Sequence, residues 1–160
     1  MTFDLAQLEK VDSSELEILD LNKQPTGVFI ELYNTDSETG DEARKKHLKR
    51  LSNWYKGKRQ KQNLSKAEEA EFERLSEESS LKYLAEMTKG WRTATEYDEQ
   101  TDEPIEFKLY ITLHGEDMEC NFENARKLYR QFPVIRRQVD KYINEDANFL
   151  PGSQTTSADA

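Results

Sequence analysis

The chain has 160 residues, of which 35% are hydrophobic and 34% are charged, and its formal net charge is −9. This size and apolar content suffice for one modest core. The sequence has no apolar run near the roughly 20 residues of a membrane span, and its start, MTFDLAQLEK, lacks the pattern of a secretory signal. The single cysteine, Cys120, cannot form an internal disulfide, which fits a reducing cytoplasm.

A β-hairpin is predicted over residues 15–33, ELEILDLNKQPTGVFIELY. Apolar side chains alternate with others along both halves of this segment: Leu16 and Ile18, then Val28, Ile30 and Leu32. Between the halves, NKQPTG contains a proline and a glycine, which suit a turn.

The segment over residues 44–61 is strongly basic. It holds nine Lys and Arg and no Asp or Glu, a charge of +9, whereas the remaining 14 basic and 32 acidic residues give −18. We predict a helix of about 15 residues ending near Gly57, with one apolar stripe for the core or an interface and an exposed basic face. The stripe consists of Leu48, Leu51, Trp54 and Tyr55. The uneven charge predicts association through complementary patches, and a solvated helix face is the simpler interpretation.

A second, acidic helix begins after Ser65, which forms a capping box with Glu68. Its apolar phase slips at SEESS, so we expect a kink or break near Ser79. The helix should stop at Gly90, because glycine suits the position that follows a helix C-terminus.

Apolar residues then alternate without a miss from Ile105 to Leu113. This alternation predicts a long strand with one buried face. Its expected partner is the segment 92–97, across an acidic loop, and the pair makes a second two-stranded β-ribbon around residues 92–113. Helices or another subunit must cover the ribbon, because two strands alone are barely stable.

Two short amphipathic helices close the domain. Asn121 caps the first, and Pro133 begins the second, where a proline is tolerated in the first turn. Together the elements predict an α+β fold, mainly helical, as a single domain over residues 15–150. We expect a flexible N-terminus over residues 1–14 and a disordered tail over residues 151–160.

Recognisable catalytic chemistry is missing from the sequence. The two histidines, His47 and His114, and the lone Cys120 have no metal-ligand neighbours at a useful spacing. The six glycines are scattered singly and form no phosphate-binding loop. We therefore predict that the protein is not an enzyme and uses no cofactor or metal.

The ending ENARKLYRQFPVIRRQVDKYINEDANFL resembles that of small phage and prophage tail proteins identified as tail assembly chaperones. Two earlier pieces, DLNKQPTGVFIEL and EMTKGW, resemble the same family in the same order. This chain inserts the ribbon from Thr93 to Leu113 where the family has a short connection. The matching positions of the ending are Glu123, Asn124, Ala125, Leu128, Tyr129, Pro133, Ile135, Arg136, Gln138, Val139, Ile143, Asn148, Phe149 and Leu150.

The resemblance implies a non-enzymatic assembly factor in the cytoplasm of a bacterial host. Such chaperones coat the tape measure protein and recruit tail-tube subunits. We expect both as partners, together with self-association into a homo-oligomer, and no membrane partner. Partner or subunit contacts are predicted at Lys45, Lys46, Lys49, Arg50, Trp54, Trp91, Arg136 and Arg137.

Two alternatives stay open. The first is a permanent virion component, in the tail tube or at the head–tail joint, for which the predicted disordered tail over residues 151–160 and the ribbon would also serve. A nucleic-acid-binding regulator would use residues 44–61, where basic residues interleave with Trp54 and Tyr55. The isoelectric point of about 4.9 and the packing role of the two aromatic residues count against nucleic acid.

Overall fold

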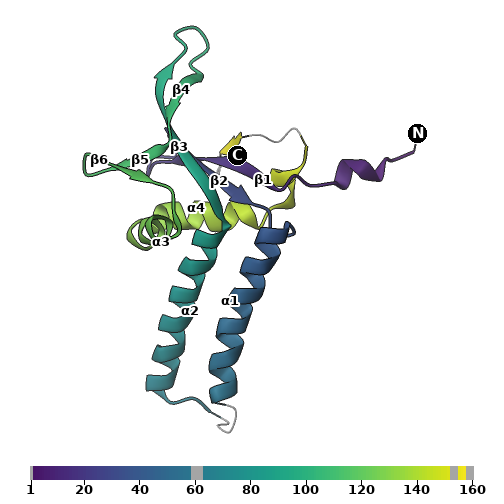
Figure 1. Ribbon diagram of the computed structural model, residues 1–160, viewed down its shortest axis with the longest axis vertical. Coiled ribbons are helices and arrows are strands. Elements are labelled where there is room, and N and C mark those ends of the chain that lie inside the picture. The colour runs from purple at the N-terminus through teal and green to yellow at the C-terminus, as the bar shows by residue number, and fades with distance from the viewer. Residues whose placement is uncertain (1, 59–62, 152–154, 158–160) are drawn as a thin grey trace.

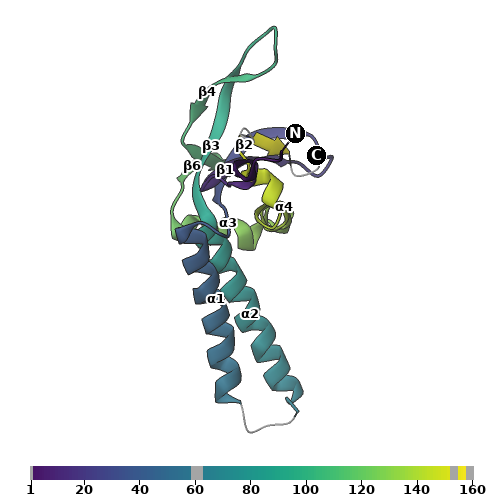
Figure 2. The same cartoon turned by 90° about the vertical axis from the view of Figure 1, so that its right-hand side faces the viewer.

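The computed structural model describes residues 2–58 and 63–151, and the backbone of residues 155–157. The fold is α+β, as predicted. Figures 1 and 2 show an elongated molecule with a central sheet and two short helices packed beneath it. A helical hairpin projects from one end of this body, and a β-ribbon projects from the other.

The predicted N-terminal hairpin is confirmed. Strands β1 (Ser13–Leu19) and β2 (Pro25–Tyr33) pair antiparallel, with Leu16 opposite Ile30. The turn lies earlier than predicted, because Asp20 Oδ1 accepts hydrogen bonds from the backbone of residues 22 and 24 and closes the loop before Pro25. Leu16 and Ile30 are fully buried on the face that packs against the helices, as the alternation indicated.

Helices α1 (Glu38–Gly57) and α2 (Lys66–Met87) form the projecting hairpin. Ser37 caps α1, which begins earlier than predicted and has 20 residues instead of about 15. The predicted capping box at Ser65 is present. Residues 59–62, including the end of the predicted basic segment, lie outside the described residues.

The predicted break near Ser79 is wrong, because α2 runs unbroken to Met87. Its first half packs against α1, where Phe72 contacts the α1 aromatic residues, whereas Leu81 and Leu84 in its second half enter the main core. Ser79 and Glu86 in the second half still contact α1, so the slip in apolar phase marks the point where α2 gains the main core as a second packing partner. The predicted stop at Gly90 is also wrong: the backbone turns extended at Thr88, and Gly90 lies within the next strand.

The second ribbon is present, but it extends the first hairpin. Strand β3 (Thr88–Tyr97) pairs with β2 through its first half and with β4 (Pro104–Lys108) through its second half, and the sheet order is β4-β3-β2-β1-β7. The lower part of β3 is thus held by β2 and by the helices beneath. Only the upper part, which pairs with β4 alone, projects from the body (Figure 2).

The predicted long strand with one buried face is wrong. It breaks at Leu109, and the chain continues as β5 (Tyr110–Leu113), which pairs with β6 (Glu116–Glu119) in a separate two-stranded sheet. Ile111 is buried, but Leu109 is 71% exposed. The signal for β6 was the pair His114–Gly115, whose φ values of 50° and 78° match the tight turn of a two-residue hairpin.

The C-terminal helix pair is confirmed as α3 (Phe122–Gln131) and α4 (Pro133–Ile143), followed by the 3-10 helix η2 (Asp146–Phe149). Asn121 accepts a hydrogen bond from the backbone of Asn124, as its capping role predicts. The buried residues of α3, α4 and η2 complete the core under the sheet: Ala125, Leu128, Tyr129, Val139, Tyr142, Ile143 and Phe149.

Strand β1 adjoins segments from near both ends of the described chain. Within the tail, the backbone of residues Thr155–Ser157 forms a short strand β7 that pairs in parallel with β1. Residues 152–154 and 158–160 of this predicted disordered tail lie outside the described residues. At the other end, residues 2–12 form an N-terminal arm that leaves the body sideways. The arm contains the 3-10 helix η1 (Leu5–Leu8), whose four residues are all exposed.

Candidate functional site

The basic face of α1 is exposed along the projecting hairpin, as predicted. Lys45, Lys46 and Lys49 all point to solvent. Lys45 Nζ lies 2.8 Å from Asp41 of the preceding turn, and Lys46 Nζ lies 3.8 Å from Glu86 of α2. Exposed pairs of this kind contribute little, roughly 0–1 kcal/mol, so these lysines can exchange their partners at low cost.

Arg50 lies between the two helices of the hairpin. Its Nε donates a 2.7 Å hydrogen bond to Ser79 Oγ, and its Nη2 donates to the Ser79 carbonyl at 3.2 Å. Nη1 lies 3.6 Å from Glu86. Arg50 therefore clamps α1 to α2 through two hydrogen bonds and one ion pair.

His47 joins the same contact. Its Nδ1 lies 2.7 Å from Ser79 Oγ, and its ring stacks on Tyr83 with 5.4 Å between the centroids. Burial lowers the pKa of His47 below its ordinary value, and the nearby charge of Arg50 lowers it further. The neutral imidazole is thus favoured at this junction.

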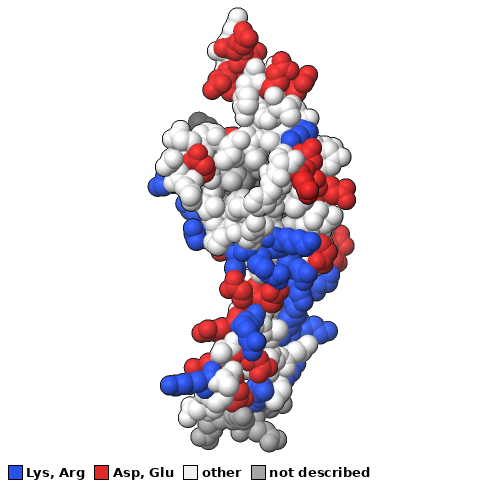
Figure 3. Space-filling model, turned by 90° about the vertical axis from the view of Figure 1, so that its left-hand side faces the viewer, with Lys and Arg blue, Asp and Glu red and all other residues white. Residues whose placement is uncertain are grey.

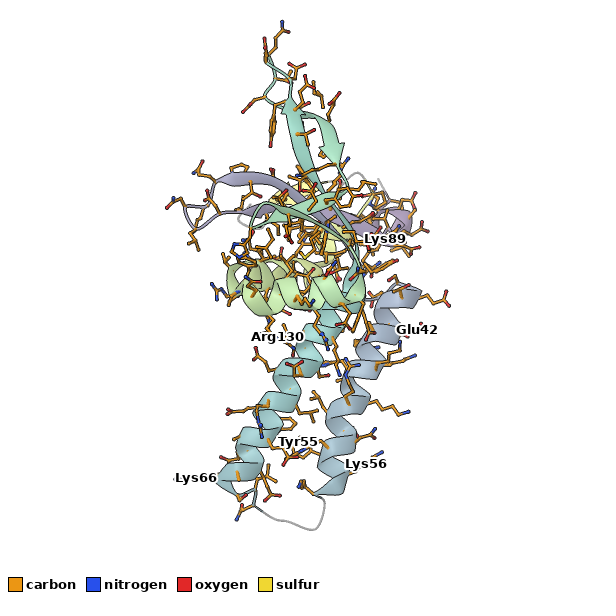
Figure 4. All side chains as sticks on the ribbon, turned by 60° about the vertical axis from the view of Figure 1, so that its left-hand side comes forward. Glu42, Tyr55, Lys56, Lys66, Lys89 and Arg130 are labelled. Carbon is orange, nitrogen blue, oxygen red and sulfur yellow. The ribbon has the colours of Figure 1, made fainter. Side chains whose placement is uncertain are left out.

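An aromatic cluster lies at the far end of the hairpin, formed by Trp54, Tyr55 and Phe72. Their ring centroids lie 4.8–5.4 Å apart. Trp54 Nε1 donates a 2.9 Å hydrogen bond to Glu71, so the indole is partly engaged within the chain. Figure 4 shows Tyr55 on the half of α1 that is remote from the sheet, where its side chain is 51% exposed.

Trp91 is not a surface residue. Its side chain is only 4% exposed, and Nε1 donates a 3.0 Å hydrogen bond to the Met118 carbonyl of β6. The indole therefore links the small β5–β6 sheet to the main sheet. Trp91 therefore cannot contact a partner directly as predicted, and it can affect a partner only by holding β6 in place.

Arg136 and Arg137 lie in the first turns of α4 and differ in their surroundings. Arg136 Nη1 lies 2.5 Å from Glu77 of α2, whereas Arg137 is exposed. Both line a hollow of about 240 Å³ together with His47 and Tyr83. The structure thus brings α4 and the basic helix to one surface, and Figure 3 shows Lys and Arg gathered where the hairpin meets the body.

The tip of the β3–β4 ribbon carries the opposite charge. Residues 96–106 contain six Asp and Glu and no Lys or Arg. Figure 3 shows these carboxylates at the end of the molecule that points away from the helical hairpin. The acidic run was visible in the sequence, but its separation from the basic surface depends on the way β3 leaves the sheet.

Groups suited to catalysis are sparse among the residues that the structure describes. No group of three or more His, Cys, Asp and Glu side chains in that part of the chain could hold a metal ion. Burial raises the pKa of the Cys120 thiol to about 11, so little reactive thiolate forms at neutral pH. None of the described helices combines the length and the apolar character needed to cross a membrane.

Comparison with known proteins adds no relative: no protein-family model, no curated protein and no solved structure matches this chain.

Proposed function

We propose that this protein is a tail assembly chaperone of a bacteriophage, which binds the tape measure protein and helps to recruit tail-tube subunits in the host cytoplasm. It acts by binding and not by catalysis. The observation that carries the proposal is the incompletely covered apolar stripe of α1, on a helical hairpin that projects from the core.

The stripe has the spacing of a helix-packing seam. Leu48, Leu51 and Tyr55 recur every three or four residues along α1. Leu48 and Tyr55 are each 51% exposed, because α2 covers only one side of the stripe. A third amphipathic helix laid along α1 would bury both side chains, which is the helix-in-groove mode of recognition.

The lysines beside the stripe suit an acidic or mixed helical partner. Lys45 and Lys49 precede and follow Leu48 within one turn. Charges at the edge of an apolar seam set the choice and direction of a partner helix. A tape measure protein is long, helical and prone to aggregate when it is uncovered, so it is the kind of ligand for which this surface is suited.

Co-expression with the tape measure protein of the same phage tests the proposal. Wild-type chain is expected to keep the tape measure protein in the soluble fraction, whereas Leu48→Asp and the triple variant Lys45→Glu, Lys46→Glu, Lys49→Glu should lose this effect. Ile105→Asp is the matched control, because Ile105 is 54% exposed but lies on the ribbon. Equal solubilisation of the tape measure protein by all four proteins would contradict the assignment of the binding surface to α1.

Mass spectrometry of purified virions separates the chaperone from a permanent tail-tube or head–tail joining protein. A chaperone is expected to be missing or strongly depleted, and stoichiometric amounts would favour the structural role.

Nucleic-acid binding is disfavoured by Glu71 and Glu86, which lie against Trp54 and Lys46 in the basic helix. Such binding would appear as salt-dependent DNA affinity.

A further inference from the structure

The N-terminal arm exposes large apolar side chains while its base is fixed. Phe3, Leu5 and Leu8 are 60%, 71% and 61% exposed. Leu5 and Leu8 begin and end η1, and residues three apart in a 3-10 helix lie one above the other, so they form one apolar edge. An edge of this kind gains stability only when another surface covers it.

The base of the arm is tied to the body. Val11 N donates a 2.6 Å hydrogen bond to the Phe149 carbonyl, and the Val11 carbonyl accepts one from Asn34 Nδ2 at 2.8 Å. Lys10 Nζ pairs with Asp36 and, at 2.9 Å, with Asp146. The arm therefore leaves the body at a defined place, and Figure 1 shows it directed away from the sheet.

A groove of about 340 Å³ lies at the opposite end of β1. It is formed between the β1–β2 turn and α4, and its volume is in the range of roughly 300–1,000 Å³ that is typical of ligand sites. Its lining combines apolar and basic side chains: Leu19, Leu21, Lys23, Val134, Arg137 and Lys141. Asp20 also contributes to the lining and accepts hydrogen bonds within the turn, and with one acidic and three basic side chains the lining keeps a net positive charge.

The arm and the groove are complementary in chemistry. The arm presents its apolar edge between Asp4 and Glu9, with no basic residue before Lys10. The groove presents leucines and Val134 beside three basic side chains. Burial of the leucines would supply the affinity, and the opposite charges would orient the arm.

The arm and the groove are separated by the length of β1. The arm joins β1 at Ser13, and the groove begins at Leu19. Seven residues of strand span about 20 Å, and the arm points away from the β1–β2 turn, which forms one side of the groove (Figure 1). A second copy of the chain satisfies this geometry directly.

We propose that the N-terminal arm of one copy docks in the groove between the β1–β2 turn and α4 of a second copy. The contact uses a different surface on each partner, so every bound copy still offers one arm or one groove. Such heterologous contacts produce rings or open head-to-tail assemblies. This proposal goes beyond the proposed function, because it requires no tape measure protein.

Sedimentation velocity of the full chain over a range of concentrations tests the proposal. Wild type is expected to associate as its concentration rises, whereas the arm variant Leu5→Asp, Leu8→Asp and the groove variant Leu21→Asp should each sediment as monomers. Both sites are exposed, so the substitutions leave the core intact. Leu109→Asp is the matched control, since Leu109 is 71% exposed like Leu5, and it should associate as wild type does.

Mixing the two variants gives the decisive result. The arm variant keeps its groove and the groove variant keeps its arm, so the mixture should form one-to-one dimers that do not grow further. A wild-type chain that is monomeric at every concentration, variants that associate as wild type does, or a mixture that stays monomeric would each overturn the proposal. If Leu21→Asp associates normally but fails to solubilise the tape measure protein, the groove belongs to that partner and the arm does not occupy it.

Discussion

Tyr129 of α3 is fully buried at the point where α3 meets the end of α2. Its hydroxyl lies 2.5 Å from Thr88 Oγ1, and Thr88 donates its own proton to the Leu84 carbonyl at 2.8 Å. The Tyr129 hydroxyl is therefore the donor to Thr88. Burial raises the pKa of Tyr129 well above its ordinary value, and the ring stays neutral under all ordinary conditions.

Truncation of this side chain should destabilise the whole domain. We expect Tyr129→Ala to lower the free energy of unfolding by about 3–5 kcal/mol, as for other large aromatic residues in cores. Tyr129→Phe removes only the hydrogen bond and should cost about 0.5–1.5 kcal/mol. Urea unfolding measures both, with Phe122→Ala on the exposed side of the same helix as the control. A loss for Tyr129→Ala as small as that for Phe122→Ala would contradict the packing described here.

His47 predicts a pH dependence with a defined sign. Its pKa is lower in the folded chain than the ordinary value of 6.5, first because it is buried and second because Arg50 is near. Below about pH 6.5 the unfolded chain therefore binds the proton more readily than the folded chain, and the stability of the fold decreases as the pH is lowered. The stabilising contribution is complete above that pH and is lost as the pH drops through the folded pKa.

Urea unfolding at about pH 7.5 and about pH 5.5 isolates this contribution. Wild type should lose more stability than His47→Gln over that interval, because the variant has no imidazole to protonate. Parallel pH profiles for wild type and His47→Gln would show that His47 does not carry the effect.

At the scale of the elements, the start of α1 depends on a close approach to the preceding loop. A Cβ atom at Gly40 would lie 2.1 Å from the Asn34 carbonyl oxygen and 3.0 Å from Thr35 Cα. That carbonyl also accepts hydrogen bonds from Ser37 N at 3.1 Å and Ser37 Oγ at 2.6 Å, so the loop cannot move without breaking the helix cap.

Gly40→Ala should therefore destabilise the protein by roughly 1–3 kcal/mol, in the range of overpacked cores. Gly57→Ala, at the other end of the same helix, is the matched control, because no described residue other than its neighbours along the helix places an atom within 4 Å of the position of its Cβ. That control should leave stability unchanged or raise it by up to about 1 kcal/mol through helix propensity. Denaturant unfolding of both variants compares them, and similar losses would contradict the close contact at Gly40.

At the scale of the whole molecule, opposite charges lie at separate places. Basic side chains gather where the hairpin meets the body, and the acidic ribbon tip lies at the far end (Figure 3). The proposed arm and groove also carry opposite charges. A molecule with this polarity favours head-to-tail contacts between its copies.

Self-association should therefore weaken as salt is added. Light scattering at about 50 mM and about 500 mM NaCl is expected to report a clear fall in average mass, because exposed charges are screened within about 10 Å at 0.1 M salt and over shorter distances above it. An average mass that is the same at both salt concentrations and exceeds that of the monomer would show that apolar contacts alone hold the copies together, and a monomer at both would contradict self-association.

Local signals in the sequence were sufficient to predict most elements and the α+β class. The capping box at Ser65, the cap at Asn121 and the helix start at Pro133 all depend on contacts within one turn, so they can be read without the fold. The alternation around Leu16 and Ile30 likewise reported a buried strand face. The exposure of Lys45, Lys46 and Lys49 followed from the helical period of their segment.

The tertiary structure decided the features that depend on the choice of partner. The period of α2 slips near Ser79 because the helix, while still in contact with α1, also enters the main core from Leu81 onward. The alternation through Leu109 breaks because β5 leaves the sheet for β6. Trp91 is buried because β6 folds over it, and Arg50 faces inward because Ser79 lies opposite. A periodic pattern specifies which face of an element is apolar, whereas the element that covers this face is set by contacts between residues far apart in the chain.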